Sequence, residues 1–255
     1  MSIVAGSLAG SLTASTVAIG GAGGDEIEAY LARPAGSHAR GGVVVIHHLP
    51  GYDRSMKEIT RRFAEIGYDA ICPNLYSRQA PGAAPAEAAE LVRSQGGITD
   101  DQLLGDVAGA AAHLRGLDTG NGKVGVIGYC SGGRQSVLAA CGLDVDAAVD
   151  CYGAFVTGTP PEGFPLKVTN LVAQLPDLRC PLLGLFGNDD AAPSAAHVDE
   201  LEQILRREGK TFEFHRYDGA AHAFFSPDRR SYRVDAANDG WQRIERFFGS
   251  YLAGP

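Results

Sequence analysis

The sequence predicts an α/β fold with a mostly parallel central sheet, helices on both faces and an N-terminal antiparallel hairpin. Short runs such as residues 43–46 are continuously apolar, as in strands that are covered on both faces. Longer segments with an apolar stripe, such as residues 99–117, alternate with these runs. Repeated alternation of strand and helix is typical of parallel sheets that lie between two helical layers.

Local sequence patterns support each of the expected strands and helices. Residues 13–19 and 27–33 form the expected hairpin, because the Gly-rich segment 20–24 separates two strand-like runs. The helix 55–66 is followed by a glycine suited to a C′ position, and the helix 99–117 begins with the spacing of a capping box. The other expected strands are residues 43–46, 69–72, 123–128, 147–152, 181–187 and 211–217. The other expected helices are the segment after residue 128 to about residue 142, residues 195–208 and residues 232–251.

We find neither an internal repeat nor a linker, so residues 1–255 are expected to form a single domain. Within it, the small and polar segment 1–24 could be loosely ordered. Residues 77–97, rich in Ala, Pro and Gly, are expected to be irregular and to border the functional site.

Composition excludes several classes of protein. The net charge is −8 and no basic run exists, which argues against a nucleic-acid partner. Five cysteines without a C-x-x-C pair indicate a reducing compartment. The first thirty residues lack Lys and Arg, and no apolar run reaches eighteen residues, so we expect neither a signal peptide nor a membrane span. The expected location is cytoplasmic.

The most informative motif is Gly128-Tyr129-Cys130-Ser131-Gly132, which directly follows an apolar run. This is the layout of the nucleophile elbow of an α/β-hydrolase fold, with a thiol in place of the usual hydroxyl. The strand must turn into a helix within about one residue, so neighbouring side chains must be small. The N-terminus of the following helix favours a thiolate. The alternative is an ordinary strand–turn–helix in which Cys130 is buried and inert.

The chain order of such folds places an acid and then a histidine downstream of the nucleophile. Asp189 and Asp190 follow the seventh expected strand, and His222 follows the eighth. We favour Asp189 over Asp190 because it leaves the strand first. Alone, Asp189 could cap a helix and His222 could lie on a surface loop. Together with Cys130 they predict a catalytic triad.

Beyond these residues, five segments resemble the dienelactone hydrolase (carboxymethylenebutenolidase) family across nearly the whole domain. The segments are residues 73–82 (PNLYSRQAPG), 128–133 (GYCSGG), 151–153 (CYG), 187–189 (GND) and 221–224 (AHAF). The resemblance implies a triad of Cys130, His222 and Asp189, no cofactor, and hydrolysis of an enol-lactone or related ester. It also implies that Arg78 binds a substrate carboxylate, a task that suits a planar guanidinium. The alternative for Arg78 is a loop arginine that caps a helix.

His48 departs from the family pattern. It stands where typical members carry a glutamate that takes part in activating the thiol, so activation is expected to depend more on His222 and the elbow helix. The backbone N–H of Leu49 in the same loop is expected to complete an oxyanion hole with that of Ser131. The alternative for the pair His47 and His48 is a metal site, but no third ligand follows at a recognised spacing, so no metal is expected.

The second departure is Ser226, four residues after the predicted catalytic histidine, where the family often has another carboxylate-binding arginine. Arg229 and Arg230 are close enough in sequence to substitute for it. The loss of this arginine weakens the case for a dienelactone as the substrate.

The expected reaction passes through a thioester on the cysteine, with a small ester or lactone as substrate. Tyr152 and Phe224 are expected to contact the substrate together with Arg78 and His48, although aromatic residues beside strands are more often core. The protein is expected to be a monomer or a homodimer. The alternatives are a general carboxylesterase or thioesterase on the same triad, and a thiol sensor or ligand-binding protein without turnover. A nucleotide-binding protein is disfavoured because the glycine and lysine motifs of such sites are missing.

Overall fold

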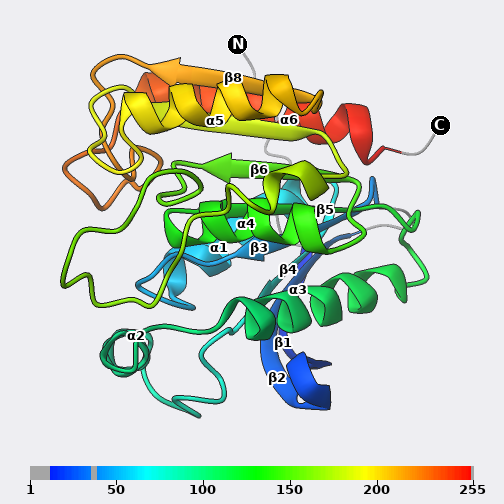
Figure 1. Cartoon of the computed structure of the whole chain (residues 1–255). Helices are drawn as coiled ribbons and strands as arrows, with labels where there is room; N and C mark the ends of the chain where they lie inside the picture. The colour runs from blue at the N-terminus through cyan, green and yellow to red at the C-terminus, as the bar shows by residue number, and fades with distance from the viewer. Residues whose placement is uncertain (1–11, 36–38, 254–255) are drawn as a thin grey trace.

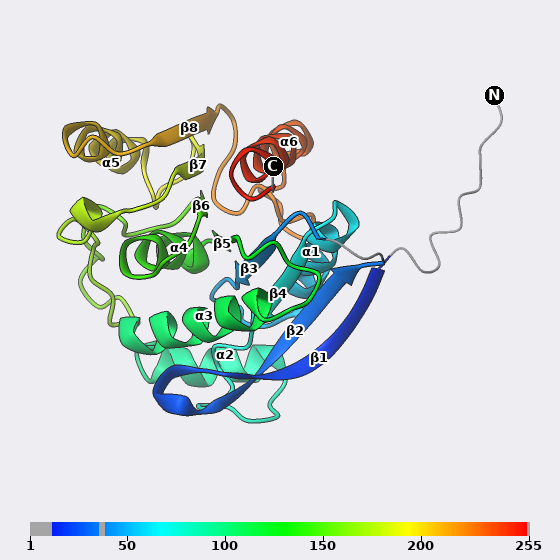
Figure 2. The same cartoon turned by 90° about the vertical axis from the view of Figure 1, so that its right-hand side faces the viewer.

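A computed structural model describes residues 12–35 and 39–253. In these ranges eight strands form one sheet in the order β1-β2-β4-β3-β5-β6-β7-β8 (Figures 1 and 2). The strands are β1 (Leu12–Gly20), β2 (Glu26–Pro34), β3 (Gly42–Ile46), β4 (Asp69–Pro73), β5 (Val124–Tyr129), β6 (Ala147–Cys151), β7 (Leu182–Gly187) and β8 (Phe212–Tyr217). The structure therefore has the predicted α/β-hydrolase fold.

The N-terminal hairpin is confirmed. β1 and β2 pair antiparallel from Leu12 opposite Pro34 to Gly20 opposite Glu26. β2 then pairs antiparallel with β4, whereas all pairs from β4 through β8 are parallel. Residues 12–24 thus form a strand and the short 3-10 turn η1 (Ala22–Gly24), while the first eleven residues of the segment expected to be loosely ordered lie outside the described part.

Helices cover both faces of the sheet (Figure 2). They are α1 (Arg54–Glu65), α2 (Pro85–Ser94), α3 (Asp100–Arg115), α4 (Ser131–Gly142), α5 (Ala195–Arg207) and α6 (Val234–Tyr251). In β3, Val43 and Val45 pack into the core under α1 and α6, while Val44 and Ile46 pack into the core under α3, α4 and α5. This alternation explains why the strand is apolar at every position.

The prediction that residues 77–97 are irregular is wrong for α2. This helix begins with Pro85 in its first turn, where the missing N–H has no cost, and it buries Ala88, Ala89 and Val92. The short helical pattern is difficult to recognise in the sequence because Pro- and Gly-rich segments flank it. The long segment with little regular structure is instead residues 152–181, between β6 and β7, which contains only the 3-10 turn η2 (Leu175–Asp177).

In the described ranges, no helix combines the length and the apolar character that crossing a bilayer requires. The parallel strands all end at one edge of the sheet, so the loops after β3, β5, β6, β7 and β8 meet there. These loops carry His48, Cys130, Tyr152, Asp190 and His222, which places the predicted chemistry at a single edge.

Candidate active site

Cys130 lies at a strained turn between β5 and α4. Its backbone has φ +58° and ψ −120°, a region that residues with a side chain rarely adopt. A Cβ on Gly128 would overlap the carbonyl of Gly132, and one on Gly132 would overlap the carbonyl of Ile46. The N–H of Cys130 donates to the Cys151 carbonyl at 3.0 Å. The local geometry is therefore that of an elbow that only glycine neighbours permit, with the thiol at the start of α4.

His222 connects this thiol to a carboxylate. Its Nδ1 lies 2.8 Å from Oδ2 of Asp190, whose side chain is 2% exposed. Burial lowers the pKa of His222, but hydrogen bonds to Asp190 and to the Cys130 thiol outweigh this effect and raise it to about 10. The histidine is thus positioned to hold the proton of the thiol, while the carboxylate fixes the orientation of the ring.

The residue that contacts His222 is not Asp189, so the sequence prediction is corrected at this position. Asp189 is exposed, and its N–H donates to the Ala220 carbonyl at 3.0 Å. The chain turns once more at Asp190, whose N–H donates to the Gly187 carbonyl and whose Oδ1 accepts from the Ala192 N–H at 2.9 Å. Consecutive residues in this turn point in different directions, so the first carboxylate out of the strand faces solvent.

Tyr152 packs against the other side of His222. The ring centroids are 5.1 Å apart in an edge-on arrangement, and Tyr152 has a left-handed backbone with φ +47°. Phe224 lies 5.3 Å from the Tyr152 ring and is fully buried among aromatic side chains. Tyr152 therefore contacts the predicted base directly, whereas Phe224 supports Tyr152 from the core.

The loop after β3 separates its two histidines. His47 accepts the Leu75 N–H at its Nε2 and lies 2.9 Å from the His48 carbonyl at Nδ1, and burial lowers its pKa to about 4. The Nε2 of His48 lies 2.8 Å from Oδ2 of Asp53, which also caps α1 by accepting the Met56 N–H. The two rings therefore have different partners. In the described ranges no group of three His, Cys, Asp or Glu side chains could hold a metal ion.

Leu49 and Ser131, the expected oxyanion donors, border the same cavity of about 60 Å³. Tyr76 lies in its wall and donates its hydroxyl to the Leu49 carbonyl at 3.1 Å, which fixes that loop. Burial raises the pKa of Tyr76, and the nearby Cys130 sulfur contributes in the same direction. The loop of Leu49 and the elbow are thus neighbours, as an oxyanion hole between their backbone N–H groups requires.

Arg78 has other partners than the predicted substrate. Its guanidinium donates twice to the fully buried Asp106 carboxylate, at 2.9 Å each, and once to Asp25 at 2.7 Å. A fourth bond, at 3.0 Å, goes to the Ala22 carbonyl. These contacts fix the N-terminal hairpin to α3. They leave no pair of N–H groups on the guanidinium free to bind a substrate carboxylate. These contacts do not support the role in substrate binding that the resemblance implies for Arg78, and that role stays a prediction.

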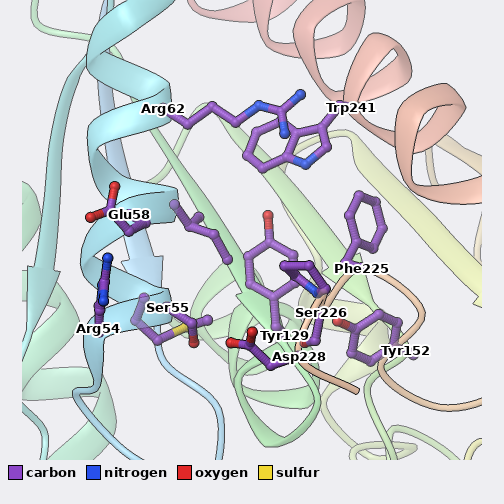
Figure 3. Close-up of a pocket in the computed structure, with 13 residues that line it drawn as sticks. Arg54, Ser55, Glu58, Arg62, Tyr129, Tyr152, Phe225, Ser226, Asp228 and Trp241 are labelled. Carbon is purple, nitrogen blue, oxygen red and sulfur yellow. The ribbon is translucent and has the colours of Figure 1, made fainter. Parts of the chain in front are cut away.

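The loop after His222 shows no replacement for the missing family arginine. Ser226 lines a second cavity of about 440 Å³, beside Tyr129, Tyr152 and Trp241 (Figure 3). Arg229 and Arg230 are exposed and line neither this cavity nor the smaller one. They therefore stay without an assigned role.

Sequence reasoning missed Asp53, although the signal was present. Aspartate at the N-cap of a helix, with serine two residues later, is a recognisable start pattern. That Asp53 also binds His48 could not be derived from spacing, because the ring must first be placed by the turn after β3.

Comparison with known proteins shows the family to which the chain is similar. The sequence model described as "Dienelactone hydrolase family" matches residues 27–252. Proteins named "Putative carboxymethylenebutenolidase" include one from Methylorubrum extorquens, 33% identical over 228 residues that span 88% of this chain and 77% of the relative. Another, from Escherichia coli (strain K12), is 33% identical over 89% of this chain and 84% of the relative.

Solved structures with a similar fold include members of the same family. The crystal structure titled "Putative Dienelactone Hydrolase" from Klebsiella pneumoniae has a TM-score of 0.80 and 32% identity, covering 94% of this chain and 99% of that one. A dienelactone hydrolase-like promiscuous phosphotriesterase from metagenomic libraries, at 21% identity and a TM-score of 0.77, shares the fold over 96% of this chain and 100% of that one.

Proposed function

This chain belongs to the dienelactone hydrolase family, and on that premise we propose that it hydrolyses a small ester or lactone with Cys130 as nucleophile, His222 as base and Asp190 as orienting acid. The observation that carries the proposal is the 2.8 Å contact between His222 and the buried Asp190, beside a cysteine with φ +58°. A base held by a carboxylate next to a strained nucleophile is the arrangement that acyl transfer needs.

The first half of the reaction forms a thioester. His222 takes the thiol proton, and the sulfur of Cys130 attacks the substrate carbonyl. The carbonyl oxygen becomes an oxyanion that accepts the N–H groups of Leu49 and Ser131. When the tetrahedral intermediate collapses, the carbon–oxygen bond to the leaving group breaks. The leaving oxygen then receives the proton from His222.

The second half releases the acid. His222 removes a proton from water, whose oxygen attacks the thioester carbonyl. The new oxyanion uses the same two N–H groups. Collapse breaks the carbon–sulfur bond, and the sulfur of Cys130 recovers its proton from His222. The products are a carboxylic acid and the free thiol enzyme, so no cofactor enters the cycle.

The substrate class rests on the relatives, whose name specifies an unsaturated lactone with a carboxymethylene group. We propose a carboxylated enol-lactone or ester of this kind. One observation favours a second candidate, a general small carboxylesterase or thioesterase on the same triad. Arg78, the expected anchor for a substrate carboxylate, donates to Asp106, Asp25 and Ala22 instead.

A panel of four substrates separates these candidates: a carboxylated dienelactone, a neutral lactone, an aryl acetate and an acyl thioester. Cys130→Ala should lower kcat/KM on every accepted substrate by at least about 10⁴-fold while the circular dichroism spectrum stays unchanged. Turnover that survives in Cys130→Ala would remove the proposed nucleophile. Selectivity for the carboxylated lactone supports the first candidate, and equal turnover of the uncharged esters supports the second.

Arg78→Ala tests whether this arginine stabilises the fold rather than binding the substrate. Because the variant leaves the buried Asp106 unpaired, we expect a loss of about 3 kcal/mol in the free energy of unfolding. In the folded variant, KM for the carboxylated lactone should stay within about twofold of that of the wild type, since the guanidinium is bonded to Asp106, Asp25 and Ala22. A KM that rises for the carboxylated lactone alone would restore the role predicted from sequence.

We also propose the domain organisation and the cellular location of the protein. All the site residues lie at the edge of one eight-stranded sheet, which supports a single α/β-hydrolase domain over residues 1–255. The five free cysteines, four of them buried, support a cytoplasmic location.

A further inference from the structure

Beside the candidate active site, α1, α6 and the loop after β8 border a cavity of about 440 Å³ (Figure 3). This volume falls in the range of small-molecule sites. Its lining residues include neither Cys130 nor His222, and the ring of Tyr152 lines the cavity on one side and contacts His222 on the other. The reaction proposed above makes no use of this space.

One end of the cavity holds a buried hydroxyl without a partner. The Tyr129 side chain is 1% exposed, and its Oη has no hydrogen-bond partner in the described part of the chain. In Figure 3 this hydroxyl points toward Arg62 and Trp241. A buried hydroxyl that makes no hydrogen bond is unfavourable, so an acceptor atom at this position would be stabilising.

The same end carries a positive charge that is available to a ligand. The guanidinium carbon of Arg62 lies 3.9 Å from the centre of the Trp241 ring. Among the residues that the structure describes, no carboxylate comes within ion-pair distance of Arg62. Stacking on the indole holds the guanidinium plane in place and leaves its N–H edge for a planar anion.

The remaining walls of the cavity suit a ligand that has a flat apolar ring and a single charge. Tyr152, Phe225 and Trp241 contribute aromatic surface. Arg54 and Glu58 lie on α1 away from the Tyr129 hydroxyl, and Asp228 lies at the end opposite Arg62 (Figure 3). Asp228 would repel a second negative charge, so a dicarboxylate fits less well than a monocarboxylate.

From these observations we propose that the cavity is a binding site for a small aromatic monocarboxylate, separate from the site of covalent chemistry. The carboxylate pairs with the Arg62 guanidinium and accepts the Tyr129 hydroxyl. The aromatic ring lies among Tyr152, Phe225 and Trp241. Because Tyr152 also packs against His222, an occupied cavity adjoins the catalytic base without displacing it.

The chain offers a direct signal for this test, since Trp241 is its single tryptophan. Titration of the wild-type protein with benzoate should give a saturable change in tryptophan fluorescence, and benzamide, its neutral counterpart, should bind at least about tenfold more weakly. Arg62→Gln should weaken benzoate binding by about tenfold or more, and Arg62→Lys, which keeps the charge, by less. Tyr129→Phe should weaken it about fivefold, because one hydrogen bond is lost.

Two controls make the result specific. Arg61→Gln alters the neighbouring arginine of α1, which pairs with Glu58 and does not line the cavity, so benzoate affinity should stay at the wild-type value. Cys130→Ala should also bind benzoate as the wild type does, even if no substrate is ever found. Equal affinity for benzamide, equal affinity in Arg62→Gln and Arg61→Gln, or binding that is lost in Cys130→Ala would each overturn the proposal.

Discussion

Two histidine–carboxylate pairs lie at the same edge of the sheet with the same separation. His222 and Asp190 are 2.8 Å apart in the loops after β8 and β7, and His48 and Asp53 are 2.8 Å apart between β3 and α1. Their surroundings differ. The Asp190 side chain is 2% exposed, whereas that of Asp53 is 29% exposed. The length of such a contact alone therefore says little about the role of the pair.

The remaining partners of each pair show the difference. Cys130 is the other group that raises the pKa of His222, so this ring has a carboxylate and a thiol as neighbours. Asp53 also accepts the Ser55 hydroxyl and the Met56 N–H, so its second oxygen is directed at the start of α1. In the proposed mechanism the first pair orients the catalytic base, whereas the second pair connects a loop to the start of a helix.

Among these variants, the one that disrupts the pair of His222 and Asp190 should lower kcat/KM the most. Asp190→Asn keeps the shape of the side chain but removes the charge that orients His222, so kcat/KM on an aryl acetate should fall about 10³-fold or more. The free energy of unfolding of this variant, measured in urea, shows whether the loss reflects unfolding rather than catalysis.

Asp189→Asn is the matched control, because Asp189 is the neighbouring exposed carboxylate. Its kcat/KM should stay within about twofold of that of the wild type. If the two variants exchanged their effects, the assignment of the acid to Asp190 would be wrong.

A smaller effect is expected from the second pair, and it concerns stability. Asp53→Ala removes the N-cap of α1 and should lower the free energy of unfolding by about 1–2 kcal/mol. Asp53→Asn keeps a good capping residue while weakening the contact with His48, so it should lose less stability. A loss of kcat/KM as large as that of Asp190→Asn would place the second pair in the chemistry and contradict the comparison.

The pH dependence of stability should differ in sign between the pairs. Burial tends to raise the pKa of Asp53, but hydrogen bonds from His48 and Ser55 hold it well below its usual range. Its contribution to the free energy of unfolding is therefore full above about pH 4 and declines as the pH falls further. The stability difference between wild type and Asp53→Asn, followed in urea from pH 7 to pH 3, should shrink on the acid side.

The stability contribution of His222 should show the opposite trend with pH. Its pKa is raised to about 10, so its contribution is full below about pH 6.5 and is lost as the pH rises toward 10. The stability difference between wild type and His222→Gln should shrink on the alkaline side. A difference that grows with pH would mean that the histidine is neutral in the folded protein.

Much of the site could be predicted because its signals are local. The apolar run of β5 and the glycines around Cys130 belong to one short segment, and each glycine is required by a close approach of the backbone. His222 follows from chain order, since the last parallel strand must end at the same edge as the others.

Other parts depend on contacts that no spacing encodes. The choice between Asp189 and Asp190 depends on a turn that is fixed by hydrogen bonds to the loop after β8. The partners of Arg78, at Asp25 and Asp106, are 53 and 28 residues away in sequence. The carboxylate that contacts a histidine or an arginine is therefore decided by tertiary structure.

The proposed mechanism requires that Cys130 carry the acyl group, and the mass of the acyl-enzyme shows whether it does. Wild-type protein mixed with an aryl acetate and quenched in acid before steady state should gain the mass of one acetyl group, and peptide mapping should place it on Cys130. Asp189→Asn should become labelled at the wild-type rate, and Asp190→Asn far more slowly. An acetyl group on Ser131 or elsewhere, or turnover without label on Cys130 at any quench time, would contradict the mechanism.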